Sequence, residues 1–341
     1  MAVKVLVTGG FGFIGSNFIR HALENRPDWH ITNLDSLAYS GNPENLTDVL
    51  AHPRHSVVIG DIQDRARVMR LVTENELVIH FAAESHVDRS IADARAFIDT
   101  NVTGTLSLLD SMRVKGCGRF VHVSTDEVYG SLPLDRPDLK FTEETPIAPS
   151  SPYSASKAAS DGLVRAYHHT YNIDAVTTRC SNNFGPWQFP EKVIPLFITN
   201  LLQGRKVPLY GDGLNVRDWL HVLDHCEAII AVAERGRAGE VYNIGGDNEC
   251  SNLDLTHMLI DALGADTSRI DWVADRLGHD RRYAIDSSKL QNELGWKPTR
   301  SQWPQALVET VNWYKANETW WQRVKSGDYR ETQHRMIAEA S

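Results

Sequence analysis

Short apolar runs alternate with helix-like stretches through the first 130 residues, and this alternation is the feature that most constrains the fold. Amphipathic stretches such as Gly15–Glu24 and Arg65–Thr73 separate the runs, which are rich in β-branched residues. This pattern is typical of a parallel sheet covered by helices on both faces. Buried strands are predicted at Val3–Val7, His30–Leu34, Ser56–Ile59, Leu77–Phe81 and Arg119–Val123. The sequence therefore predicts an α/β fold with a doubly wound parallel sheet.

The second half of the chain has a different pattern. Ser131–Ser151 is rich in proline and acidic residues and is predicted to be a surface loop. A helix is expected from near Tyr153 to about Tyr171, and a strand over Asp174–Thr178. From about Phe184 the alternation weakens, as expected of an added lobe in a chain of 341 residues. We expect a sheet domain over 1–183 and a smaller lobe, mainly ligand-binding and interleaved with returns to the sheet, over 184–341.

Charge, hydropathy and cysteine spacing narrow the class of protein. The net charge of −9 argues against nucleic-acid binding, and no run approaches the roughly 20 apolar residues of a membrane helix. The N-terminal residues pass straight into an apolar strand, without the basic stretch and longer apolar run of a signal peptide, so a cytoplasmic location is expected. Reduced, buried thiols are expected at the scattered Cys117, Cys180, Cys226 and Cys250. No metal is expected at His86, His122 and His279, whose spacing is not that of metal ligands.

Glycines lie between the first strand and the first helix, in the run Val5–Gly15. Glycine permits the dihedrals of a tight turn and lets the backbone approach a pyrophosphate at the helix N-terminus. A plain strand-to-helix turn would show the same glycines, but Asp35 follows Gly15 by 20 residues at the end of the second strand. A carboxylate there accepts hydrogen bonds from an adenosine ribose and repels a 2′-phosphate, which favours NAD over NADP.

Tyr153 and Lys157 are four residues apart at the start of a predicted helix, hence on one face. A phenol ordinarily titrates near pH 10, and a neighbouring ammonium lowers that pKa. The pair therefore predicts a tyrosine that acts as a base, although an exposed pair on a solvated helix would have the same spacing. Thr125 ends the fifth strand, at the edge where parallel sheets bind their ligands.

Several longer motifs carry a family resemblance. With the glycine run, Asp61-Ile62, Tyr153 and Lys157, the chain resembles the extended short-chain dehydrogenase/reductase superfamily. Within that superfamily it is similar to the dTDP-glucose 4,6-dehydratase family from about Val3 to Tyr329. The motifs that carry this similarity are Ala82–Ser90, Ser124–Gly130, Ser181–Pro186, Phe189–Lys192 and Gly278–Tyr283.

The resemblance implies a Rossmann-type fold, bound NAD and three chemical steps. Tyr153 would take the proton of the sugar C4 hydroxyl while NAD+ accepts the hydride. The C4 ketone acidifies the C5 proton, which Glu127 would remove, and Asp126 would protonate the departing C6 hydroxyl. Hydride return to C6 then gives a 4-keto-6-deoxy sugar. Two adjacent carboxylates in a closed site can separate their pKa values in this way. The implied catalytic residues are Thr125, Asp126, Glu127, Tyr153 and Lys157.

The resemblance also implies two sets of contacts. Cofactor contacts are expected from Gly9, Gly12, Phe13, Ile14, Gly15, Asp35, Asp61, Ile62, Ala82, Ala83, Ser85, Thr100, Tyr153, Lys157 and Asn183. Substrate contacts are expected from Ser85, His86, Thr125, Asn182, Glu191, Lys192, Pro208, Tyr210, Arg217, Asn252, His279 and Arg282. Of these, Arg217 and Arg282 are expected at the diphosphate, because a planar guanidinium can engage two phosphate oxygens together.

Three alternatives stay open. A 4,6-dehydratase acting on UDP-glucose or another nucleotide sugar would share the mechanism. A nucleotide-sugar 4-epimerase performs no elimination, so Asp126-Glu127 argues against it. A non-catalytic dinucleotide sensor would be expected to lack Tyr153, Lys157 or the carboxylates, which are all present.

Two further expectations come from the family. Its members form homodimers through a four-helix bundle, to which Ala92–Lys115 and Tyr153–Tyr171 would contribute the long helices. Trp187 and Leu277 depart from the family pattern, which usually has a smaller aromatic residue and often a proline at these positions. Both departures are expected near the nucleotide or sugar.

Overall fold

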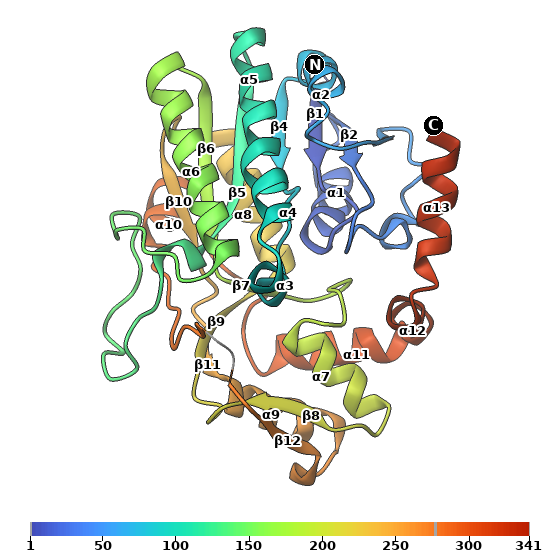
Figure 1. The fold of residues 1–341 in the computed structure, drawn as a ribbon, viewed down its shortest axis with the longest axis vertical. Helices are drawn as coiled ribbons and strands as arrows, with labels where there is room; N and C mark the ends of the chain where they lie inside the picture. Colours follow the sequence, from blue (N-terminus) through green and yellow to red (C-terminus); the bar gives the residue numbers. More distant parts are fainter. Residues whose placement is uncertain (1, 276–277, 341) are drawn as a thin grey trace.

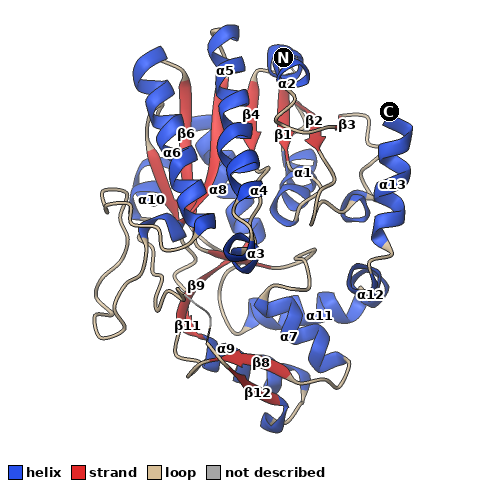
Figure 2. Cartoon of the chain, in the orientation of Figure 1, coloured by secondary structure: helices blue, strands red, loops and turns tan. Residues whose placement is uncertain are grey.

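A parallel sheet of seven strands forms the centre of the protein (Figures 1 and 2). The computed structural model describes residues 2–275 and 278–340. The strands are β1 (Val3–Thr8), β2 (Trp29–Asp35), β3 (His55–Ile59), β4 (Leu77–His80), β5 (Arg119–Thr125), β6 (Asp174–Cys180) and β10 (Val241–Ile244). Their order is β10-β6-β5-β4-β1-β2-β3, and every pair is parallel. The predicted Rossmann-type α/β class is confirmed, with strand ends shifted by one or two residues.

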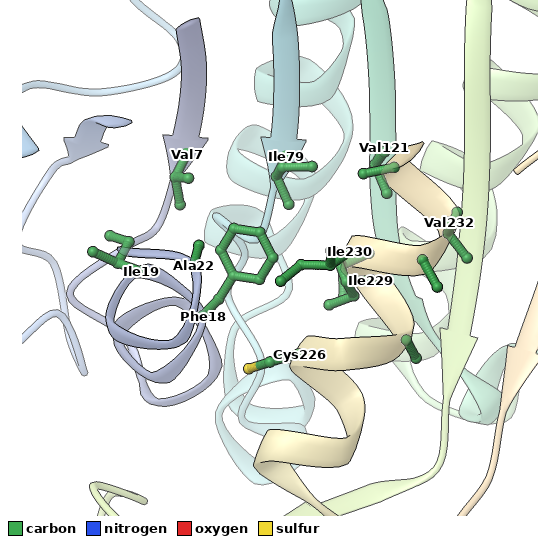
Figure 3. Close-up of a cluster of buried hydrophobic side chains, with 14 of the residues drawn as sticks. Val7, Phe18, Ile19, Ala22, Ile79, Val121, Cys226, Ile229, Ile230 and Val232 are labelled. Carbon is green, nitrogen blue, oxygen red and sulfur yellow. The ribbon is translucent and has the colours of Figure 1, made fainter. Parts of the chain in front are cut away.

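Helices cover both faces of this sheet, because alternate strand residues point to opposite sides. One layer consists of α2 (Arg65–Glu74), α5 (Thr105–Lys115) and α6 (Pro152–Tyr171), and it packs on residues such as Leu6 and Val78. The other consists of α1 (Phe13–Asn25), α8 (Val222–Arg235) and α10 (Ser288–Leu294). In Figure 3, Phe18 of α1 and Ile230 of α8 face Ile79 of β4. Each such fully buried side chain stabilises the fold by about 1.5–3 kcal/mol.

The second lobe lies beyond the carboxyl ends of the strands (Figure 1). It contains α7 (Val193–Leu202), β8 (Val207–Tyr210), α9 (Asn252–Leu263), β12 (Ile270–Val273) and α11 (Gln305–Ala316), and it has a core of its own around Phe197 and Trp321. A three-stranded sheet joins the lobes: β7 (Asn182–Phe184), β9 (Val216–His221) and β11 (Glu249–Ser251). Because α8 and β10 follow residue 184 yet belong to the main sheet layer, the chain returns to that layer, and the boundary at 184 stays a prediction.

The helices before β5 and at the C-terminus differ from a simple alternation of strands and helices. The expected helix Ala92–Lys115 is divided: α3 (Val87–Ala92) ends before α4 (Arg95–Phe97), and a π-helical segment, Ile98–Gly104, leads into α5. The C-terminal helices α12 (Glu318–Ser326) and α13 (Tyr329–Ala340) run back to the sheet edge at β3. Within the described residues, no helix combines the length and the apolar character needed to cross a bilayer.

Candidate active site

A cavity of about 340 Å³ opens at the carboxyl ends of β1 and β4. These strands are neighbours in the sheet although the chain passes through β2 and β3 between them, so connections leave this point toward opposite faces. Such a switch point leaves a crevice in which α/β sheets bind ligands. All fifteen residues expected to contact the cofactor line this cavity: Gly9, Gly12, Phe13, Ile14, Gly15, Asp35, Asp61, Ile62, Ala82, Ala83, Ser85, Thr100, Tyr153, Lys157 and Asn183.

The glycine run forms one wall of this cavity. Gly9 has a φ of +74°, and a Cβ there would lie 2.6 Å from the backbone nitrogen of Ala82. A Cβ at Gly15 would lie 2.2 Å from the Gly9 carbonyl oxygen. Neither position can carry a side chain without moving the backbone. Gly12 is the N-cap of α1, so the unpaired N–H groups of that helix face the crevice.

Asp35, the last residue of β2, holds the glycine-rich turn that follows β1. Its Oδ2 accepts the Phe11 N–H at 2.9 Å, and its Oδ1 accepts the Leu37 N–H at 2.8 Å. Burial raises the pKa of this carboxyl, and the two backbone hydrogen bonds oppose that shift. Each carboxylate oxygen still has a second lone pair for a ribose hydroxyl. The glycine turn, the helix terminus and this carboxylate together fit a dinucleotide.

The five catalytic candidates meet in the same cavity. Thr125 ends β5, and Asp126 and Glu127 open a short 3₁₀ helix, whose Glu127 N–H donates to the Thr125 hydroxyl at 3.2 Å. Tyr153 and Lys157 come from the first turns of α6, which a reciprocal capping box at Ser151 and Ser154 starts. The strand end and the helix start therefore bring the predicted set together.

The surroundings of Asp126 favour its protonated form. Asp126 is buried, and burial is the main cause that raises its pKa well above the usual range, followed by the charges of Glu127 and Asp218. Arg217 and the Thr125 hydroxyl oppose the shift. Its Oδ2 has no hydrogen-bond partner among the described residues. A carboxyl group in such surroundings can donate a proton near neutral pH.

The pKa of Tyr153 differs from the sequence-based expectation. Burial raises it well above 10, and the charge of Glu127 raises it further, while the Thr125 hydroxyl lowers it. Lys157 donates to the Val123 carbonyl oxygen at 2.9 Å, and burial lowers the pKa of its own ammonium to about 8. The predicted lowering of the Tyr153 pKa is therefore wrong for the protein chain alone, because burial and the charge of Glu127 raise it.

A second cavity of about 240 Å³ continues from the first into the smaller lobe. Residues that line both include Ser85, Glu127, Asn182 and Lys192. Ten of the expected substrate contacts line the second cavity: Ser85, His86, Asn182, Glu191, Lys192, Pro208, Tyr210, Arg217, Asn252 and His279. Thr125 lines the first cavity. The two cavities thus share a wall that contains Glu127.

Arg217 of β9 is a buried cation in this second cavity. Its guanidinium lies 4.2 Å from the centre of the Tyr283 ring and donates to the carbonyl oxygens of Val216, at 2.7 Å, and Asp280, at 2.9 Å. Tyr283 lines the cavity too, and so does Gln188, which lines both cavities. The expected contacts omit both residues, although Tyr283 closes the Gly278–Tyr283 motif that could have indicated it.

Two positions that were expected near the ligand, Arg282 and Trp187, lie outside both cavities. Arg282 lines neither cavity: it is buried, donates to Glu249 at 2.6 Å and binds carbonyl oxygens of the proline-rich loop, including that of Leu139 at 3.0 Å. The expectation of a diphosphate contact at Arg282 is therefore corrected, because neighbouring residues of an extended segment point to opposite sides.

Trp187 is likewise outside both cavities. Its ring lies 4.9 Å from that of Trp313 and 5.3 Å from that of Trp320, with the Arg20 guanidinium 5.0 Å from its centre. The departure at Trp187 thus affects the packing behind the site and not the cavity walls. The second departure, Leu277, lies outside the described residues.

Known proteins resemble this chain over nearly its whole length. Residues 6–304 match the family described as GDP-mannose 4,6 dehydratase. A dTDP-glucose 4,6-dehydratase of an Actinoplanes species is 52% identical over 324 residues, which are 94% of this chain and 100% of the relative. The chain belongs to the dTDP-glucose 4,6-dehydratase family.

Solved structures agree with this family. The dTDP-glucose 4,6-dehydratase DesIV of Streptomyces venezuelae, with NAD bound, has 52% identity and a TM-score of 0.91, and the match covers 94% of this chain and 100% of that one. A Thermus thermophilus UDP-glucose 4-epimerase in complex with NAD has 29% identity and a TM-score of 0.84, covering 92% of this chain and 100% of that one. Dehydratases and epimerases share the fold, so the site residues must distinguish a dehydratase-family member from an epimerase.

Proposed function

We propose that this protein is an NAD-dependent hydro-lyase that converts dTDP-glucose into dTDP-4-keto-6-deoxyglucose and water. The observation that carries the proposal is the pair Asp126-Glu127, which lines the same cavity as Tyr153 and contains one carboxyl with a strongly raised pKa. Oxidation and reduction at C4 need no such acid. The dTDP-glucose 4,6-dehydratase activity of the relatives with 52% identity supports the same reaction.

The first cavity supplies the surroundings that NAD needs. The glycine turn and the α1 terminus would hold the pyrophosphate, and Asp35 the adenosine ribose. Bound NAD+ would accept the hydride from C4 and return it to C6. Asp61 and Ile62, which follow β3, lie at the adenine end of this cavity in the proposed arrangement.

Tyr153 would remove the proton of the C4 hydroxyl. Its phenolate needs nearby positive charge, because burial favours the neutral phenol. Lys157 and the oxidised nicotinamide ring both carry that charge in the proposed complex. The Thr125 hydroxyl, which lowers the pKa of the phenol, would donate a hydrogen bond to the phenolate.

The two carboxylates would then divide the elimination between them. Glu127 takes the proton from C5, which the new C4 ketone has acidified. The C6–O bond breaks as the Asp126 acid donates its proton, so the oxygen leaves as water. Reprotonation at C5 and reduction at C6 complete a 4-keto-6-deoxy sugar, and NAD+ is regenerated. Each proton transfer of this kind contributes about 10²–10⁴-fold to the rate.

The second cavity would hold the nucleotide. Arg217 would face the diphosphate, and Pro208 with Tyr210 would form an apolar wall for the base. The Tyr210 ring lies 6.3 Å from that of His279, whose Nδ1 is 2.6 Å from an Asp275 carboxylate oxygen. These contacts fix the wall on one side. Thymine is the proposed base, as in the named substrate of the relatives.

The experiment that tests the function uses the purified protein with dTDP-glucose or UDP-glucose, with and without added NAD+, and follows the products by mass. We expect the loss of one water from dTDP-glucose. Faster loss of water from UDP-glucose would transfer the assignment to a UDP-sugar dehydratase. An isomeric product of unchanged mass would show epimerisation and contradict the proposal.

We also propose a cytoplasmic homodimer. Cys117, Cys180, Cys226 and Cys250 are free thiols, as is usual in a reducing compartment. Cys180 and Cys226 are buried as expected, whereas Cys117 is exposed and Cys250 is half-buried. The outer surface of α5 and α6 carries exposed apolar side chains, among them Val114 and Tyr171. These two helices pack side by side on one face of the sheet (Figure 1), which gives a second copy a two-helix surface to meet.

A further inference from the structure

A buried group of charged and polar side chains lies behind Lys157. Asp161 follows Lys157 by one turn of α6, so both side chains leave the same face of the helix. Arg179 of β6 donates through Nε to Asp161 Oδ2 at 2.9 Å, and His122 Nε2 of β5 is 3.2 Å from Asp161 Oδ1. The other end of the Arg179 guanidinium donates to the Tyr129 hydroxyl at 2.9 Å. The charged members are between 3% and 6% exposed.

This arrangement holds the Asp161 carboxylate firmly. The pKa of Asp161 is lowered by His122 and Arg179 despite its burial. His122 is neutral, since burial and the Lys157 charge lower its pKa to about 4. Asp161 is therefore a fixed negative charge between the Arg179 guanidinium and the Lys157 ammonium. No step of the proposed reaction uses it directly.

Opposing effects of the surroundings determine the protonation state of Lys157. The groups that face it come from four elements: His80 of β4, His122 of β5, Asp161 of α6 and Cys180 of β6. Burial favours the neutral amine of Lys157. Asp161 and Cys180 favour the ammonium, and Asp161 has the larger effect. A buried ammonium without a counter-charge loses its proton readily.

We propose that Asp161 is a positioning residue for the oxidation step: its buried carboxylate, held by Arg179, keeps Lys157 in the ammonium form. The inference rests on the proposed function, because Lys157 matters to catalysis only through Tyr153. Asp161 touches neither cavity and acts through Lys157. Because the Arg179 guanidinium binds the Asp161 carboxylate, that carboxylate does not pair with Lys157 alone. Lys157 Nζ instead donates to the Val123 carbonyl oxygen.

The test removes the carboxylate without leaving a buried charge uncompensated. In the double variant Asp161→Asn/Arg179→Gln both members of the ion pair become neutral amides. We expect the Lys157 titration to move down by about one pH unit or more. Because Lys157 acts as the ammonium, activity is lost as the pH rises through its pKa. The alkaline limb of the first hydride transfer should therefore move to lower pH.

The matched control is Arg179→Gln alone. It keeps the carboxylate and removes a positive charge, so the Lys157 titration should stay in place or move to higher pH. Two measurements follow each variant. One is the ¹³C NMR titration of protein labelled at the lysine ε-carbon, with Lys157 assigned from Lys157→Met. The other is single-turnover formation of reduced nicotinamide as a function of pH, a step that does not need Asp126.

The outcomes separate a charge-setting role from a structural one. A lower Lys157 midpoint in the double variant, together with an unlowered midpoint in Arg179→Gln, supports the inference. If Lys157 titrates at the wild-type pH in the double variant, Asp161 only joins α6 to β6, and the inference is wrong. The NMR midpoint requires no turnover, so failure of the proposed function would leave this test intact.

Discussion

Asp126 and Glu127 are neighbours in the chain but lie in different surroundings. Asp126 is buried and has a raised pKa, whereas Glu127 is half-buried and lines both cavities. The 3₁₀ turn that starts after Thr125 produces this difference, because it directs consecutive side chains to different sides. One carboxyl can then keep a proton while its neighbour faces the substrate.

Substituting Asp126 and Glu127 one at a time should distinguish the acid from the base. In Glu127→Gln we expect oxidation at C4 to continue, reduced nicotinamide to accumulate, and release of dehydrated product to fall by about 10²–10⁴-fold. The absorbance of reduced nicotinamide and the product mass measure both effects. In Asp126→Asn the base remains, so in deuterium oxide we expect deuterium at C5 of the recovered sugar, and none in Glu127→Gln. Full turnover by Glu127→Gln would assign the base elsewhere.

At this scale the sequence predicts positions better than environments. Tyr153, Lys157 and the carboxylates could be located because helix spacing and strand ends place them relative to one another. The side on which Arg282 points could not be predicted, since it depends on Glu249 and on carbonyl oxygens of a loop distant in the chain. Nor could the pKa of Tyr153, because burial is a property of the assembled site.

The C-terminal helices are the element whose role the sequence did not indicate. The Tyr329 hydroxyl donates to the Tyr39 carbonyl oxygen at 2.9 Å, and the Gln333 side chain donates to that of Gly41. The segment 36–41 lines the first cavity at every position except Leu37, and both Leu37 and Tyr39 have positive φ. Such strained backbone persists only where its surroundings hold it. These contacts join segments almost 300 residues apart, which local patterns cannot reveal.

The contacts that α13 makes with the segment 36–41 should increase the affinity for NAD. In the double variant Tyr329→Phe/Gln333→Ala the loop loses two hydrogen bonds, each contributing about 0.5–1.5 kcal/mol. We expect the Kd for NAD to rise by roughly ten-fold, measured by calorimetry on the cofactor-free protein. The control Gln322→Ala removes an exposed contact within α12, to Glu318, and should leave the Kd unchanged. A lower Tm with an unchanged Kd would limit α13 to a structural role.

On the scale of the whole molecule, the parallel sheet and most of its strands follow from the sequence more readily than the placement of the second lobe. Alternating apolar runs predicted six of the seven strands, because strands buried on both faces have a distinctive composition. The seventh, β10, follows the first segments of the smaller lobe, in the part of the chain where the alternation of apolar runs and helices has weakened. The return of α8 and β10 to the sheet depends on contacts between the lobes that no local pattern encodes.

The same layer of helices that contains α5 and α6 should form the interface of the proposed homodimer. On this side of the molecule Ile98, which starts the π-helical segment before α5, is 43% exposed, and Val114 of α5 is 63% exposed. A stable homodimer usually buries about 800 Å² on each partner, and two long helices can supply such a face. In Ile98→Lys/Val114→Lys, like charges would meet across the two-fold axis, while in a monomer both ammonium groups would remain in water.

Sedimentation equilibrium measures the outcome at micromolar protein. We expect the unchanged protein to be a dimer and the double lysine variant to be a monomer. The control Val308→Lys places the same charge on an apolar residue of α11 that is 43% exposed, away from this layer, and should remain a dimer. If the Ile98→Lys/Val114→Lys variant still forms a dimer, the second copy binds a different face. Because each copy contains both of its cavities, a folded monomer should keep its NAD site, so NAD content also distinguishes loss of assembly from loss of folding.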